Sequence, residues 1–193
     1  MPRAPALATL LAVAALAGGC GGTKTVTVVR TVTQVRTVTT APATTTTASV
    51  RTCLGNDLTA TFAVVPGSPG AGQISYRLRL TNSSQATCFV SGLPVVQLLD
   101  AKGAALPTQG RAAQAGQSTA ARVELQPGAS AAADARFSPD VAGTGDQQTG
   151  ACEPTAATLR VTAPGGGSVD AAVDPPTAVC ERGTLSFSVF AAA

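Results

Sequence analysis

The chain has 193 residues, a formal net charge of +3, five cysteines and no histidine. This charge is too small to indicate a nucleic-acid partner, and we expect none. The lack of histidine excludes Ser-His-Asp and Cys-His nucleophilic sites, histidine general bases and histidine-ligated metals.

The N-terminal residues predict an export signal. Ala4–Ala17 is an apolar run behind an arginine, and it is too short to span a bilayer as a mature helix. The segment ends in AGGC, which resembles the lipobox of bacterial lipoproteins, except that Ala17 stands where that class prefers leucine. In that class the cysteine receives a diacylglyceryl group and the chain is cut just before it. We therefore expect a signal peptide over residues 1–19 and lipidation of Cys20.

The number of cysteines supports lipidation of Cys20. An exported chain with an odd number of cysteines keeps one that cannot form an intramolecular disulfide. If Cys20 carries lipid, four cysteines remain, which is enough for two disulfides in an oxidising compartment. We expect the protein to be lipid-anchored on the extracytoplasmic face of the cell membrane. The alternative is an ordinary signal peptide in which Cys20 is incidental.

Residues 20–51 form a Thr/Val-rich segment with low sequence complexity, in which VRTVT occurs twice. This composition predicts an extended, disordered tether between the lipid and a folded domain. The tether contains basic residues and no acidic ones. They either contact an anionic membrane surface or keep the segment soluble, and the sequence leaves both possibilities open.

Residues 52–193 contain short alternating runs separated by glycine- and proline-rich turns. In QISYRLRLTN, for example, Ile74, Tyr76, Leu78 and Leu80 fall on one face, which is typical of a half-buried strand. No amphipathic helix is evident. The pattern predicts an all-β fold, an immunoglobulin-like β-sandwich of about 7–9 antiparallel strands stapled by disulfides. The expected strands lie in DLTATFAVV (57–65), QISYRLRLTN (73–82), PVVQLLD (94–100), ARVEL (121–125), AAADARF (131–137), ATLRVTA (157–163), SVDAAV (168–173) and LSFSVF (185–190).

The segment CFVSGLPVVQLLDAKG, Cys88 to Gly103, resembles the C-x-x-x-G-[YF]-P region of an actinobacterial family of secreted lipoproteins, the domain of unknown function 4232. Leu93 departs from that pattern, which favours an aromatic residue before the proline. The resemblance implies an envelope-exposed sandwich and no particular activity. It continues through Asn82 of LTN, VELQPGASAAADARF (123–137), ACEPTAATLRVTAPG (151–165) and VCERGTLSF (179–187).

Four cysteines allow three disulfide patterns. Cys53 precedes the first expected strand and Cys180 the last, and in many sandwiches these two strands lie side by side in parallel. On this topological ground we expect Cys53 to pair with Cys180 and Cys88 with Cys152. The alternative, a zinc site, is disfavoured because the cysteines are far apart in sequence and form no C-x-x-C motif.

Sequence motifs for catalysis are missing: there is no G-x-S-x-G, S-x-x-K or P-loop. We therefore expect no catalytic residues, no cofactor and no metal. Asp140 and Asp146 resemble half of a calcium loop but lack its dense acidic alternation. The acidic residues Glu153, Glu181, Asp170 and Asp174 are better explained by surface solvation than by catalysis.

Two classes of function remain, with a structural spacer as a third possibility. The first is a non-enzymatic binding module for an unknown envelope protein, glycan or small ligand, which would use the connections Gly103–Thr119 and Pro139–Gly150. Arg111 and Asp146 are the candidate binding residues in these loops. The second is a hydrolase or an enzyme inhibitor that uses carboxylates alone. A close pair of acids with a raised pKa would favour the enzyme, and scattered acids would favour the module.

Overall fold

The computed structural model of the protein describes residues 49–116 and 122–193, which belong to one compact unit that begins at Thr46. The expected signal peptide, Cys20 and the tether up to residue 48 lie outside the described residues. No helix in the described part of the chain is long and apolar enough to cross a membrane.

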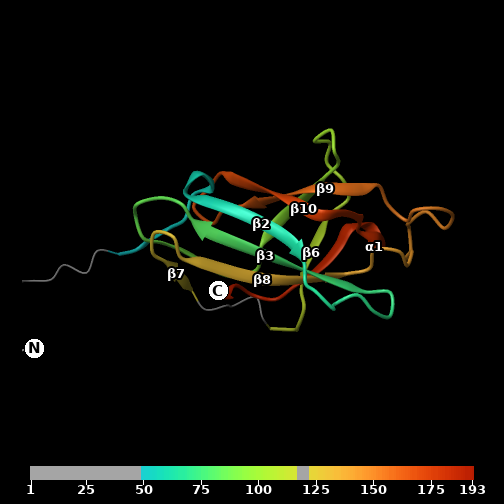
Figure 1. Ribbon diagram of the computed structural model, residues 1–193, viewed down its shortest axis with the longest axis horizontal. Coiled ribbons are helices and arrows are strands. Elements are labelled where there is room, and N and C mark those ends of the chain that lie inside the picture. Colours follow the sequence, from blue (N-terminus) through green and yellow to red (C-terminus); the bar gives the residue numbers. More distant parts are fainter. Residues whose placement is uncertain (1–48, 117–121) are drawn as a thin grey trace, which may run out of the picture. The chain divides into compact units, whose positions relative to one another are not determined.

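The structure confirms the all-β prediction (Figure 1), and every segment expected to be a strand contains one. Beyond these it has four short strands, β1, β4, β6 and β12, and two single helical turns, η1 (Gly55–Asp57) and α1 (Cys180–Gly183). The strands are β1 (Arg51–Thr52), β2 (Leu58–Val64), β3 (Ile74–Asn82), β4 (Cys88–Val90), β5 (Val95–Leu99), β6 (Gln109–Ala112), β7 (Val123–Leu125), β8 (Ser130–Phe137), β9 (Thr155–Thr162), β10 (Ser168–Ala178), β11 (Thr184–Phe187) and β12 (Ala191–Ala192).

Nine strands form one large sheet in the order β5-β9-β10-β2-β3-β8-β11-β6, with β12 paired to β8. The two edges of this sheet approach each other. The Leu106 amide donates to the Leu98 carbonyl at 2.9 Å, and the Leu98 amide donates to Thr108 Oγ1 at 2.9 Å. The sheet is therefore nearly barrel-shaped. A small sheet of order β1-β4-β7 accompanies it.

The expectation of uniformly antiparallel strands is wrong for three pairs. β1 pairs with β4, β2 with β10, and β6 with β11, and all three pairs are parallel. The partners in each pair are separated by other strands in the chain. Long connections therefore return the chain to the end of the sheet where the first partner began, as parallel pairing requires.

The core of the large sheet follows from the alternation in its strands. Tyr76 and Leu78 of β3 are fully buried, whereas Arg77 between them is exposed. The Tyr76 ring lies between two phenylalanine rings, with centroids 5.1 Å from Phe62 and 5.3 Å from Phe137. Its hydroxyl donates to the Pro175 carbonyl at 2.7 Å, so the one polar atom of this aromatic cluster is satisfied.

We expect Tyr76→Phe to lower the free energy of unfolding by about 1 kcal/mol, because the Pro175 carbonyl loses its donor. Burial, together with the charge of Asp174, raises the pKa of Tyr76 above its ordinary value of 10.0. The contribution of the protonated Tyr76 side chain to stability is therefore complete below that ordinary value. It is lost as the pH rises through the folded-state pKa. Urea titrations at neutral and alkaline pH measure both effects. Equal alkaline loss of stability in wild type and variant would contradict the assignment.

The predicted disulfide pairing is wrong, although all four cysteines do form disulfides. Cys53 pairs with Cys88 and Cys152 with Cys180, with Cα–Cα distances of 4.9 and 5.4 Å. The prediction assumed that the strands after Cys53 and Cys180 are neighbours. Instead β2 lies beside β10, and β11 lies between β8 and β6. Cys53 reaches Cys88 because β1 pairs with β4 in a register that places Arg51 opposite Cys88.

Candidate functional site

The two disulfides join different elements of the domain: Cys53 lies between β1 and η1, and Cys180 is the first residue of α1. The first described residues, from β1 to η1, lie at the left of Figure 1. The loop of residues 139–150 and α1, whose first residue Cys180 is bonded to Cys152, lie at the right.

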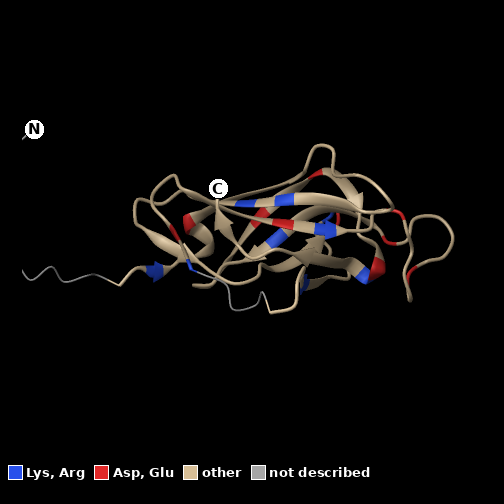
Figure 2. Ribbon diagram, turned by 90° about the horizontal axis from the view of Figure 1, so that it is seen from below, with Lys and Arg blue, Asp and Glu red and all other residues tan. Residues whose placement is uncertain are grey.

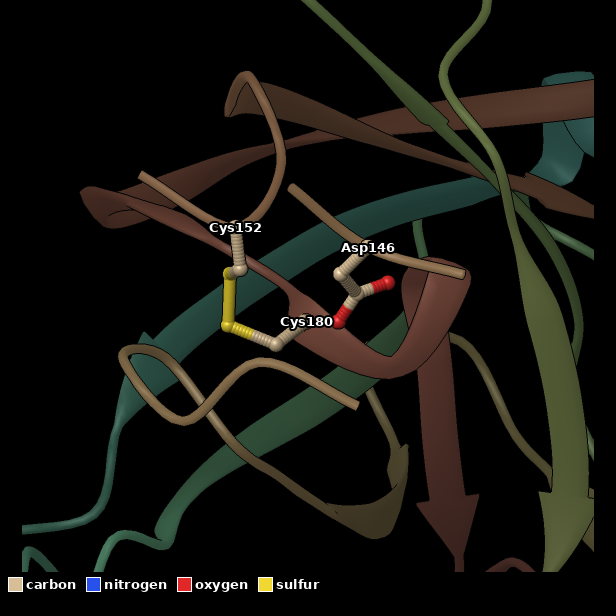
Figure 3. A group of neighbouring side chains, drawn as sticks. All are labelled: Asp146, Cys152 and Cys180. Atoms are coloured by element: carbon tan, nitrogen blue, oxygen red, sulfur yellow. A yellow bond between two sulfur atoms is a disulfide. The ribbon is translucent and has the colours of Figure 1, made fainter. Parts of the chain in front are cut away.

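Asp146, one of the two candidate binding residues, is buried in this region and holds α1 (Figure 3). Its carboxylate accepts backbone N–H bonds from Gly143 at 2.8 Å, Glu181 at 2.6 Å and Arg182 at 2.7 Å. Glu181 and Arg182 have φ values of 54° and 56°, in the left-handed region that non-glycine residues rarely adopt. This conformation turns successive amides toward one anion and forms a nest for the carboxylate. Asp146 thus has a structural role, and its binding role stays a prediction.

Asp146 and Glu153 form a pair of acids with opposite pKa shifts. Burial tends to raise the pKa of Asp146, but the backbone N–H bonds outweigh it and hold that pKa below its ordinary value of 3.8. Burial raises the pKa of Glu153, and the charge of Asp146 and a hydrogen bond to it raise it further, while Arg182 opposes the shift. Asp146 is therefore the ionised member, and Glu153 keeps its proton to a higher pH than an ordinary glutamate.

We expect Asp146→Asn to lower the melting temperature by several degrees at neutral pH, because the amide has only one oxygen for three donors. Since the folded-state pKa of Asp146 is lowered, its stabilisation is present above the ordinary value and is lost as the pH falls through the folded-state value. The gap between wild type and variant should therefore close in acid. Thermal unfolding at neutral and acidic pH measures it. The control is Asp140→Asn, on the same loop and exposed; an equal loss there would refute the role of Asp146.

The same region contains three potential metal ligands, Asp146, Cys152 and Cys180, whose ligand atoms lie within 4.8 Å of one another. The two sulfur atoms are bonded to each other (Figure 3), so they offer no thiolate to a metal. The carboxylate is already bound by backbone amides. The disulfide thus explains why Cys152 and Cys180 lie together without a zinc ion. The backbone amide contacts likewise explain the position of Asp146, which in the sequence resembled part of a calcium loop.

Arg111, the other candidate binding residue, lies exposed on β6. Its Nη2 donates to Gln109 Oε1 at 2.8 Å, and its backbone pairs with Ser186 of β11. Among the described residues no hydrogen bond or ion pair joins Arg111 to Asp146. The two residues that the sequence singled out are therefore not joined by a direct polar contact.

Sequence reasoning did not identify the outer surface of β2, β3 and β8 as a candidate site, although the alternation RLRL in β3 already placed two arginines on one face. We call this surface the arginine face and define it by Thr61, Ala63, Arg77, Arg79, Ala132, Asp134 and Arg136. Figure 2 shows basic and acidic bands on neighbouring strands of the domain. Within the arginine face Arg77 is paired with Asp134, whereas Arg79 has no partner among the residues that the structure describes.

Two hollows flank Arg79 on the arginine face. One, of about 300 Å³, lies over β3 and β8 and is lined by Arg77, Arg79, Ala132 and Asp134, with Ser188 and the last three residues. The other, of about 200 Å³, lies over β2 and β3 and extends from Thr61 to the turn at Pro66. The small side chains around Arg79 leave room for a ligand on both sides of its guanidinium.

An apolar hollow of about 280 Å³ lies elsewhere, between the β4–β5 connection, the end of β9 and Phe190. Leu93, Pro94 and Val161 contribute to its lining. Val95, which also lines it, is 65% exposed and is a large apolar side chain on the edge strand β5. The described part of the chain offers no charged side chain in this lining, so this hollow is a less selective site than the arginine face.

A family model described as "Domain of unknown function (DUF4232)" matches residues 53–191. The match covers both disulfides, Asp146 and the whole arginine face. No curated protein and no solved structure matches the chain.

Proposed function

Because the chain belongs to the DUF4232 family, whose description names no activity, we propose a function from the chain's own features. The protein is a lipid-anchored module on the extracytoplasmic face of the cell membrane. It binds an envelope partner through an exposed surface of its β domain and catalyses no reaction. Cys20 carries the lipid, and residues 20–51 connect it to the domain.

The cysteine pairing supports this proposal most directly. Cys53, Cys88, Cys152 and Cys180 are all used in disulfides within the domain. Cys20 is then the one cysteine of the chain without an intramolecular partner, and it lies in a lipobox-like sequence directly behind an apolar segment. Two disulfides also fit an oxidising compartment better than a reducing one.

The intact mass of the membrane-extracted protein, with and without reduction, tests the proposal. We expect a chain that begins at Cys20, carries the mass of a diacylglyceryl group and has no free thiol. Reduction of the two disulfides should add the mass of four hydrogen atoms and nothing else. An unmodified Cys20, or a chain that is released from membranes without detergent, would refute the anchoring.

An enzyme that works with carboxylates is the second candidate, and the Asp146–Glu153 pair is the observation that favours it. Two neighbouring acids whose pKa values are shifted in opposite directions, upward for Glu153 and downward for Asp146, are the arrangement that acid–base catalysis needs. However, the carboxylate of Asp146 is bound by three backbone amides that fix α1, which leaves it poorly placed to act on a substrate. Hydrolysis of chromogenic esters or glycosides by the full chain, abolished by Glu153→Gln, would reverse our preference for the module. A structural spacer would show neither turnover nor binding.

The immunoglobulin-like architecture is also part of the proposal. Its support is the set of short strands with one buried face, from which a common core is built. The three parallel pairs and the nearly closed sheet are departures from the two antiparallel sheets of immunoglobulin domains.

A further inference from the structure

Two arginines on outer faces of the large sheet are held in the same way, each by an aspartate directly opposite on the neighbouring strand. Arg77 of β3 faces Asp134 of β8, with Nε–Oδ1 and Nη2–Oδ2 distances of 2.7 and 3.0 Å. Arg160 of β9 faces Asp170 of β10, with both distances 2.8 Å. In each pair two parallel hydrogen bonds join a guanidinium to a carboxylate. In both pairs, therefore, the position opposite an outward-facing arginine is occupied by an aspartate of the neighbouring strand.

Arg79 lacks this aspartate. It lies two residues after Arg77 on the same face of β3, and the residues opposite it are Thr61 on β2 and Ala132 on β8. Neither can supply a carboxylate, and no described residue forms a hydrogen bond or an ion pair with Arg79. Ala132 stands opposite Arg79 as Asp134 stands opposite Arg77, but its methyl group leaves the space of a carboxylate empty. The hollow of about 300 Å³ lies over this position.

The charge of the arginine face favours an acidic ligand. It carries three arginines, Arg77, Arg79 and Arg136, against one acid, Asp134, so positive charge is in excess. Arg79 is also partly buried among small side chains, which reduces the entropy that its side chain loses on binding and the competition from water.

We propose that Arg79 binds a carboxylate of a partner protein, which enters the hollow above Ala132 and pairs with the guanidinium as Asp134 pairs with Arg77. The proposal rests on the proposed binding function and specifies its ligand, an acidic side chain presented by an extended segment. Thr61, opposite Arg79 on the other side, offers a hydroxyl to the same segment.

Ala132→Asp tests the proposal because it supplies the missing carboxylate from within the chain. By analogy with Asp134 beside Arg77, the new aspartate should pair with Arg79 and exclude an external ligand. Ala132→Asn is the matched control, since it has nearly the same size and no charge. The probe is poly-L-glutamate, titrated into the full chain at fixed ionic strength. Binding is followed through the Nε–H signals of the arginines in NMR spectra.

We expect the Arg79 Nε–H signal to shift with poly-L-glutamate, and Arg79→Ala and Ala132→Asp each to weaken binding roughly fivefold. Ala132→Asn and Arg136→Ala should retain more of the affinity than either of these variants. Equal losses in Arg136→Ala would show general charge attraction and overturn the proposal, as would wild-type binding by Ala132→Asp. A preference of Arg79 for polyphosphate over poly-L-glutamate would assign the site to phosphate and refute the carboxylate ligand.

This experiment and the mass measurement fail independently. Loss of the lipid assignment at Cys20 would remove the membrane anchor and leave binding at Arg79 unaffected. Failure of poly-L-glutamate to bind at Arg79 would remove the ligand assignment and leave the anchored module in place. Both results are obtained from the full chain.

Discussion

Replacement of both Cys53 and Cys88 by alanine is expected to lower the free energy of unfolding by about 4 kcal/mol. The disulfide closes a loop with a sequence separation of 35 residues, so its loss restores much chain entropy to the unfolded state. Both cysteines are fully buried, and the disulfide ties β1 to the first residue of β4. Chemical denaturation of the oxidised double variant, compared with the wild type, measures the difference.

Single variants check the pairing itself. Cys53→Ala should leave one free thiol in the domain, at Cys88, which alkylation reaches once the protein is unfolded, and should keep Cys152 and Cys180 joined. Alkylation followed by peptide mapping identifies the free thiol. A free Cys180 in this variant would instead support the pairing that we expected from the sequence and would contradict the structure. The matched double variant Cys152→Ala/Cys180→Ala, which opens a loop of 28, should lose a similar amount.

The strands could be predicted from the sequence because alternation of apolar and polar residues is a local signal. Tyr76, Leu78 and Leu80 identify β3 without knowledge of any other part of the chain. Which strands become neighbours is a non-local property. The short strand β1 determines the position of Cys53, and its two residues carry no recognisable pattern. For this reason the residues of the disulfides were predicted correctly and their partners were not.

The candidate site shows the same division between local and non-local information. The arginines of β3 were visible in the sequence, but the presence of Asp134 opposite Arg77 and of Ala132 opposite Arg79 depends on the β3–β8 register. Asp146 was noticed as a polar residue in a long loop. Its structural role depends on backbone amides of Glu181 and Arg182, 35 and 36 residues away. Backbone donors leave no trace in a sequence, so this role could not be predicted.

Asn82→Asp is expected to destabilise the protein by about 4 kcal/mol at neutral pH, because it exchanges a fully satisfied amide for a buried charge facing carbonyls. Asn82 is completely buried at the end of β3. Its Nδ2 donates to the carbonyls of Ala86 and Leu125 at 2.8 Å each. Its Oδ1 accepts from the amide and the hydroxyl of Ser84 at 3.0 and 2.7 Å. One side chain therefore joins the large sheet, the β3–β4 turn and strand β7 of the small sheet.

The pH dependence separates this mechanism from simple loss of packing. The new carboxyl group is buried beside two carbonyl oxygens, so its folded-state pKa should lie above the ordinary value of about 3.9. The destabilisation should be smallest in acid, where the protonated acid can still donate one hydrogen bond. It should grow as the pH rises through the unfolded-state pKa toward the folded-state value, above which it is constant. Urea titrations across this range provide the measurement, with Asn56→Asp, an exposed position in η1, as the control. A pH-independent loss for Asn82→Asp would mean that the side chain fills space and that its four hydrogen bonds contribute little.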